Sequence, residues 1–149
     1  MMTDWTWLDR KPDFSVPISV EAADIDGLGH INNVTYVRYF ERVGWAHSCA
    51  LGLDIAAYRD LDRAMVVRRN EIDYLQPGYL GDDLMADTWI IVNDGKASLE
   101  RLFQLTRKSD GAVLARAHTF YTCVSFSAGR VRRMPESFIR LYAVSPSFG

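Results

Sequence analysis

The sequence predicts an α+β domain in which a mostly antiparallel sheet of five strands wraps one long central helix. The first observation is a run of apolar residues at three- and four-residue steps over residues 33–51, closed by Gly52, which is typical of a buried helix. The second is that four long strand-like segments follow this helix, joined largely by tight turns. The third is size and composition, because 149 residues with 48% hydrophobic and 24% charged side chains fit one ordinary folded domain, residues 1–149.

Residues 1–15 are expected to form a lead-in that packs its aromatic side chains, Trp5, Trp7 and Phe14, on the surface. The first strand is expected over residues 16–22, and Pro17 favours an edge position because proline cannot donate to a strand ladder. The helix should then bury a broad stripe against the sheet. Its members are Val34, Val37, Phe40, Val43, Gly44, His47, Ala50 and Leu51, widened by Tyr36, Tyr39 and Ala46.

After a short helical or irregular segment at 54–63, strands are expected over residues 64–75, 84–92, 97–107 and 112–127. Pro77-Gly78 ends the first of these strands. The Asp94-Gly95 pair predicts a two-residue hairpin turn, since such turns need residues with positive φ, and residues 109–111 predict a second turn. A short terminal helix is expected over residues 135–142, with Pro135 at its start.

The composition also limits the partners and the compartment. A net charge of −2 argues against a nucleic-acid surface, which needs a concentrated basic field. Cys49 and Cys123 lie inside apolar patterns and are expected to be reduced core residues. No segment resembles a signal peptide or a membrane span, so the expected location is the cytoplasm.

The segment from Asp24 to Asn33 concentrates two acids, two glycines, a histidine and two asparagines directly before the helix. Asn32 or Asn33 is a preferred N-cap residue, and the first helical turn presents unpaired N–H groups with a positive dipole end. Gly27 and Gly29 allow the backbone to approach a ligand closely. The segment therefore fits a site in which a carboxylate faces amide donors, although an ordinary capped helix after a polar turn has the same spacing.

This segment, Asp24-Ile25-Asp26-Gly27-Leu28-Gly29-His30-Ile31-Asn32-Asn33, resembles the hot-dog fold acyl-CoA thioesterases related to 4-hydroxybenzoyl-CoA thioesterase. Further support comes from Tyr36 and residues 39–41 on the helix, and from residues 71–77 with Gly81-Asp82. The likeness covers about residues 16 to 140, and the D-x-D-x-x-G-H-x-N-N pattern is fairly specific for one subgroup.

The resemblance implies roles for individual residues. Asp26 falls where the family keeps its catalytic carboxylate, and Asn33 falls where a backbone N–H polarises the thioester carbonyl. His30 is characteristic of the subgroup. The family also pairs its sheets into homodimers or homotetramers, with the pantetheine arm entering between subunits.

Several side chains near the segment have two possible roles. Asp24 is expected to order the loop, with a share in catalysis as the alternative, and His30 is a loop-ordering hydrogen-bond donor or a base. Tyr36 either lines the acyl pocket or only packs against neighbouring side chains. Gly29 is expected to lie beside the substrate. The CoA phosphates are assigned to Arg68 and Arg69, within a pool that includes Arg130, Arg132 and Arg133, or these are solvated charges. His47 and His118 are expected in the core or an interface.

Other chemistries lack their motifs. No metal-ligand spacing, Gly-x-Ser-x-Gly elbow or nucleotide-binding glycine fingerprint is present. The leading hypothesis is a cofactor-free enzyme that hydrolyses an acyl-CoA thioester. The alternatives are a hydrolase of acyl-carrier-protein thioesters, a dehydratase of hydroxyacyl thioesters, and a non-catalytic acyl-thioester binding protein.

Overall fold

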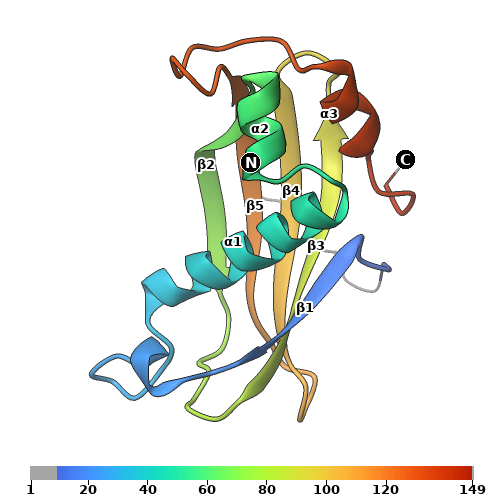
Figure 1. The fold of residues 1–149 in the computed structure, drawn as a ribbon. Helices are drawn as coiled ribbons and strands as arrows, with labels where there is room; N and C mark the ends of the chain where they lie inside the picture. The colour runs from blue at the N-terminus through green and yellow to red at the C-terminus, as the bar shows by residue number, and fades with distance from the viewer. Residues whose placement is uncertain (1–9, 149) are drawn as a thin grey trace.

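The computed structural model describes residues 10–148 (Figure 1). In chain order the elements are β1 (Phe14–Ser19), a 3-10 helix (Ala22–Asp24), α1 (Asn33–Ala50), α2 (Ile55–Leu61), β2 (Ala64–Tyr74), β3 (Asp83–Asn93), β4 (Ser98–Arg107), β5 (Val113–Val124) and α3 (Glu136–Leu141).

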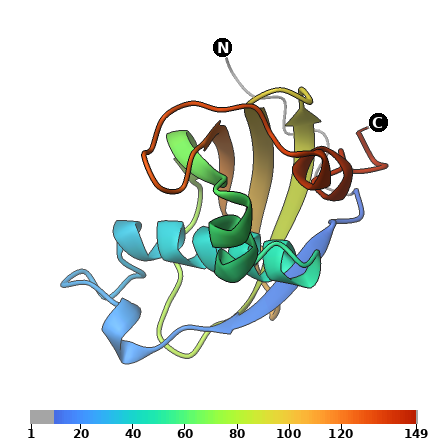
Figure 2. The same cartoon turned by 45° about the horizontal axis from the view of Figure 1, so that its top comes forward.

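The five strands form one antiparallel sheet in the order β1-β3-β4-β5-β2. Figures 1 and 2 show α1 lying across one face of this sheet, and in Figure 1 α2 and α3 lie above it, toward the upper end of the strands. The predicted fold, a five-stranded sheet around one long helix, is therefore confirmed. The prediction that Pro17 marks an edge strand is also confirmed, because among the strands of residues 10–148 β1 stands first in the sheet order and pairs with β3 alone.

Helix α1 buries a stripe centred on Tyr36, Tyr39, Phe40, Val43 and His47. These residues pack on inward-facing side chains of the strands, and Phe40 lies 5.3 Å from Phe103 between ring centroids. The predicted stripe was wrong at its ends, since Val34 is 61% exposed and Ala50 is also exposed. The sheet covers only one side of α1, so the buried face is narrower than the apolar pattern.

Two strand boundaries differ from the prediction. Strand β1 begins at Phe14, whose partly buried ring stacks on His47 with centroids 5.6 Å apart, so Phe14 does not belong to a surface lead-in. Strand β5 ends at Val124 rather than at residue 127, because the chain turns away there. The turn is held by Asp62, whose carboxylate accepts from the N–H of Ser127 at 2.8 Å and from its hydroxyl at 3.1 Å.

The predicted two-residue hairpin at Asp94-Gly95 was wrong. Asp94 does not take a positive φ, although Gly95 does. The Asp94 carboxylate instead accepts from three successive N–H groups, those of Lys96, Ala97 and Ser98, at 2.8 to 3.0 Å. The side chain therefore holds a longer loop between β3 and β4.

The two cysteines differ in exposure. Cys123 is buried as predicted, but Cys49 is exposed on α1, so its assignment to the core was wrong. Trp5 and Trp7 lie outside the described residues. No helix within residues 10–148 is long and apolar enough to cross a membrane.

Candidate active site

The loop between the 3-10 helix and α1 holds the carboxylate of Asp26 in one orientation. Its Oδ1 accepts from the N–H of Leu28 at 2.8 Å and, more weakly, from that of His30 at 3.4 Å. The Asp26 N–H in turn donates to the carbonyl of His30 at 2.9 Å. Gly29 takes φ +80° at the turn, a conformation that favours glycine. Because Oδ2 accepts from none of the described residues, it remains available to a ligand.

The start of α1 supplies an amide donor beside this carboxylate. Asn32 is the N-cap, with its side chain accepting from the Val34 N–H at 3.0 Å, and its carbonyl accepts from Thr35. The N–H of Asn33 donates to no acceptor within residues 10–148. It is therefore the first-turn amide that the protein leaves free, at the positive end of the helix dipole.

Asp24 orders the frame of the loop, as expected. Its Oδ2 accepts from the N–H of Glu21 at 3.0 Å and from the hydroxyl of Tyr39 at 2.8 Å. Burial and the neighbouring Asp24 carboxylate raise the pKa of Tyr39, so this tyrosine remains a neutral donor. The loop is thereby tied to the buried face of α1.

A close approach between segments fixes the far side of the loop. The N–H of Ile31 donates to the carbonyl of Gly78 at 3.0 Å. A Cβ at Gly78 would lie 2.3 Å from Cδ1 of Ile31, so a larger residue would force the Ile31 side chain or the backbone to shift. Gly78 therefore fixes the segment after β2 against the loop.

Asp26 and Asn33 border the same pocket of about 240 Å³, together with His30, Tyr36 and Tyr74. The imidazole of His30 makes an edge contact with Tyr79 at 5.4 Å and no hydrogen bond to the described residues, so the His30 backbone rather than its ring orders the loop. Burial raises the pKa of Tyr36, with smaller contributions from Tyr74 and Asp26. The pocket thus combines a carboxylate, an amide that no described residue occupies, and two phenols.

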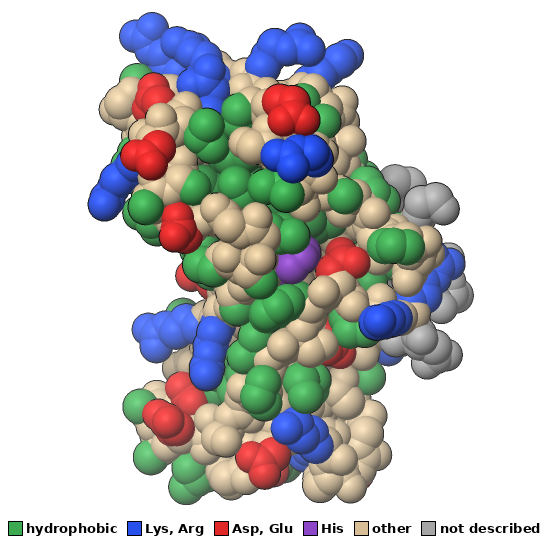
Figure 3. Space-filling model, turned by 45° about the vertical axis from the view of Figure 1, so that its right-hand side comes forward, with side chains coloured by type: hydrophobic (Ala, Val, Ile, Leu, Met, Phe, Trp, Pro, Cys, Tyr) green, Lys and Arg blue, Asp and Glu red, His purple; other side chains and the backbone are tan. Residues whose placement is uncertain are grey.

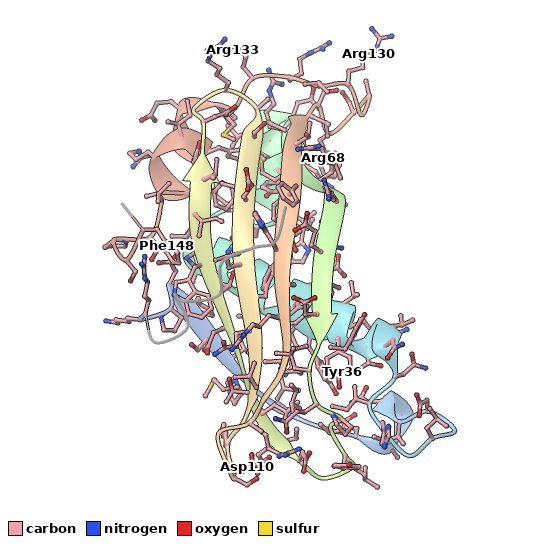
Figure 4. All side chains as sticks on the ribbon, turned by 180° about the vertical axis from the view of Figure 1, so that it is seen from behind. Tyr36, Arg68, Asp110, Arg130, Arg133 and Phe148 are labelled. Carbon is pink, nitrogen blue, oxygen red and sulfur yellow. The ribbon has the colours of Figure 1, made fainter. Side chains whose placement is uncertain are left out.

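The arginines assigned to CoA phosphates lie away from this loop within one chain. Figure 4 shows Arg130 and Arg133 at the end of the sheet opposite to Tyr36, and in Figure 3 lysine and arginine side chains gather at this upper end. Arg68 and Arg69 lie on β2, with guanidinium groups 5.7 and 5.5 Å from the centre of the Phe120 ring. The chain does not itself bring these arginines together with Asp26.

Sequence reasoning overlooked Arg101, the arginine of the buried strand β4. Its side chain is only 3% exposed and lies under the C-terminal half of α1. Leu99, Arg101 and Phe103 alternate on the strand, and this period of two was the signal that placed an arginine on the inward face.

Comparison with known proteins agrees with the observed fold. Residues 20–141 match the family model described as the thioesterase-like superfamily. The solved structure of Slr0204, a 1,4-dihydroxy-2-naphthoyl-CoA thioesterase from Synechocystis, superimposes with a TM-score of 0.78 at 18% identity, covering 87% of this chain and 94% of that one. A thioesterase from Thermus thermophilus, solved with coenzyme A and zinc, gives a TM-score of 0.72 at 27% identity, covering 89% and 93%.

The fold is that of a hot-dog domain. The chain belongs to the thioesterase-like superfamily. Among curated proteins, it is 37% identical to the THEM6 protein of Danio rerio over 93 residues, or 62% of this chain. The match spans only 45% of that relative's length.

Proposed function

We propose that the protein hydrolyses acyl-CoA thioesters to a carboxylic acid and CoA. The observation that carries the proposal is the shared pocket, in which the free Oδ2 of Asp26 and the unpaired N–H of Asn33 can reach one carbonyl group. The similar structures named as thioesterases, one of them solved with coenzyme A, support the same class of substrate.

The chemistry follows from these two groups. The Asn33 N–H donates to the carbonyl oxygen and stabilises the negative charge that develops there. Asp26 either attacks the carbonyl carbon to form an acyl-aspartyl anhydride, which water then opens, or takes a proton from the attacking water. On both routes the C–S bond breaks, the CoA thiolate leaves and takes up a proton, and one water is consumed.

Replacing the carboxylate tests its role. Asp26→Asn keeps the shape of the side chain but removes its nucleophilic and basic character, so turnover should fall at least about a hundredfold while acyl-CoA binding remains. Release of free thiol measures turnover, and calorimetric titration measures binding. A variant that hydrolyses its best substrate at nearly the parent rate would show that Asp26 is not the reacting group.

The role of the Asn33 amide has a matched pair of variants. Asn33→Pro removes the N–H at the first helical position, where proline is tolerated, and Asn32 already has the extended conformation that precedes proline, with φ −61° and ψ 138°. Turnover should fall by about 100- to 1000-fold, as for loss of one oxyanion donor. Asn33→Ala keeps the N–H and is the control, so equal activity of the two variants would remove the amide from the mechanism.

The parent protein distinguishes the competing functions when acyl-CoA and acyl-carrier-protein thioesters are compared. Hydrolysis of either substrate releases a thiol. Tight binding without thiol release from both substrates would identify a non-catalytic acyl-thioester binding protein instead.

We also propose that the protein forms a homodimer or a homotetramer. Strand β2 is an edge strand in the single chain, where its backbone groups are open to a second copy, and Val66 and Val67 on it are 40% and 45% exposed. A second copy would also bring another set of Arg68 and Arg69 guanidinium groups to the CoA phosphates. Light scattering that finds only a single-chain mass of 16.9 kDa would refute the oligomer.

A further inference from the structure

Arg101 is a buried cation without a counterion in the described chain. Its Nη1 donates to Nδ1 of His47 at 2.9 Å and to the hydroxyl of Thr88 at 3.3 Å, and its guanidinium lies 5.9 Å from the centre of the Tyr142 ring. It forms no ion pair with a carboxylate of residues 10–148, and its Nε and Nη2 donate to none of them. Burying a charge in this way is costly unless a partner compensates it.

His47 does not compensate that charge. Burial, and then the neighbouring guanidinium, lower the pKa of His47 to about 4, so the ring is neutral near pH 7 and accepts through Nδ1. The hydroxyls of Ser48, Tyr58 and Tyr142 hydrogen-bond to one another. The Tyr142 oxygen lies 2.6 Å from that of Ser48 and 2.5 Å from that of Tyr58. The polar groups that contact Arg101 directly, His47, Thr88 and Tyr142, therefore supply no negative charge.

Arg101 borders a pocket of about 280 Å³ whose other walls include Trp45, Met65, Leu99 and Tyr121. The Glu41 side chain lies at the mouth of this pocket and is exposed, but makes no ion pair with Arg101. A cation inside a largely apolar pocket matches a ligand group with a carboxylate on an apolar stem, because a guanidinium can hold a carboxylate through two parallel hydrogen bonds.

The Arg101 pocket is the last of three hollows along the seam between α1 and β2. The hollow at Asp26 comes first. A second hollow, of about 120 Å³, shares Glu41, Val67 and Tyr121 with the Arg101 pocket. From the first hollow to the third, the numbers of the bordering residues rise along α1 and fall along β2. The bordering pairs are Tyr36 and Tyr74 in the first hollow, Val37 and Ile72 in the second, and Gly44 and Met65 in the third. From Asn33 to Gly44 the helix rises roughly 16 Å, a span that an extended acyl chain can cover.

A chain that follows this seam must pass the rings of Tyr36 and Tyr74, which meet edge to face at 5.2 Å. Tyr74 is 47% exposed, and its hydroxyl donates to the carbonyl of Asn33 at 3.3 Å. Joining the first two hollows therefore requires the ring of Tyr74 to swing outward and release the carbonyl of Asn33.

We propose that the substrate's acyl group ends in a carboxylate and that Arg101 binds this carboxylate in the third hollow. The substrates would then be ω-carboxyacyl thioesters, with the thioester at Asp26 and the charged end at Arg101. This inference rests on the proposed hydrolysis for the position of the thioester, whereas the Arg101 pocket stands on its own contacts.

The test compares ω-carboxyacyl-CoA with methyl-ended acyl-CoA of the same chain length, over a series of lengths. The parent protein should show a higher kcat/KM for the carboxylate-ended substrate at the length that reaches Arg101. Arg101→Met should lower kcat/KM for that substrate by about 10- to 100-fold, as for a lost charge-assisted hydrogen bond, without lowering it for the methyl-ended one. Arg140→Met, which removes an exposed arginine on α3, is the matched control and should leave both values unchanged.

Two further measurements keep the outcomes separate. The first is binding of a free dicarboxylic acid, measured by the fluorescence of Trp45 at the pocket wall, which the parent should show and Arg101→Met should lose. If the parent shows this binding but hydrolyses no thioester, the hydrolysis is refuted and the carboxylate site stands. Glu41→Gln should retain the preference, whereas its loss would show that Glu41 shapes the selectivity. Hydrolysis of methyl-ended thioesters with no preference in the parent would overturn the inference and leave the hydrolysis standing, and this comparison needs no variant to fold.

Discussion

The two ends of α1 carry two different kinds of polar site. At the N-terminal end, Asp26 is held by backbone N–H groups from within four residues of itself, and the free amide belongs to the adjoining helix. At the C-terminal end, Arg101 of β4 meets His47 of α1, Thr88 of β3 and Tyr142 after α3, so three segments distant in sequence form its surroundings. A local site survives as long as its loop is formed, whereas a distributed site depends on the packing of the whole domain.

The difference also concerns charge. The Asp26 carboxylate borders an open pocket and accepts from backbone amides. The Arg101 cation is enclosed with neutral partners only. We therefore expect low pH, and substitutions that change the size of the cavity, to destabilise the Arg101 end first. Substitutions that disturb the backbone should destabilise the loop end first.

The largest effect is expected from acid at the Arg101 end. The folded pKa of His47, about 4, lies below the unfolded value of 6.5, so the unfolded state binds more protons between these values. The contribution of the neutral His47 ring to stability is complete above pH 6.5. It is lost as the pH falls toward 4, which lowers the unfolding free energy by up to about 3 kcal/mol. Urea unfolding at pH 7 and pH 4.5 measures it.

His47→Asn is the control for this pH dependence. Asparagine retains a hydrogen-bond acceptor for Arg101 but does not titrate, so the loss between pH 7 and pH 4.5 should become smaller. An unchanged loss would mean that groups other than His47 control the acid response.

A smaller effect is expected from the close approach at the loop end. Gly78→Ala forces Ile31 or the backbone to move, because the added Cβ would lie 2.3 Å from Ile31, and should lower the unfolding free energy by about 1–3 kcal/mol. Gly27→Ala is the matched control, since nothing lies within 4 Å of a Cβ there. Thermal unfolding of both variants measures the difference, and equal melting temperatures would contradict the proposed crossing.

The smallest effect concerns the helix cap. Asn32→Ala removes the side chain that accepts from Val34, and should cost about 1 kcal/mol of unfolding free energy. The Asn33 side chain, one residue later, makes no cap contact, so Asn33→Ala should lower the unfolding free energy by less. Urea unfolding of the two variants decides between them, and a larger loss in Asn33→Ala would show that Asn32 is not the residue that caps the helix.

The chain order of elements and the Asp26 loop could be predicted because they depend on neighbours in sequence. Apolar spacing predicted α1 at 33–51 and the structure has it at 33–50, since a helix is set by contacts three and four residues apart. The acids, glycines and asparagines before it predicted a loop with an N-cap, and Asn32 is that cap. These interactions close within a few residues, so the sequence alone is enough.

The tertiary structure alone decided what depends on distant partners. Val34 and Cys49 follow the apolar pattern, yet both are exposed because the sheet covers only one side of α1. Strand β5 stops at Val124 because Asp62, more than sixty residues earlier, binds Ser127. Arg101 is an ordinary strand arginine in the sequence, and only the packing of α1, β3 and α3 over it makes it a buried cation facing a pocket. Burial is a property of all surrounding segments together, and no local spacing records it.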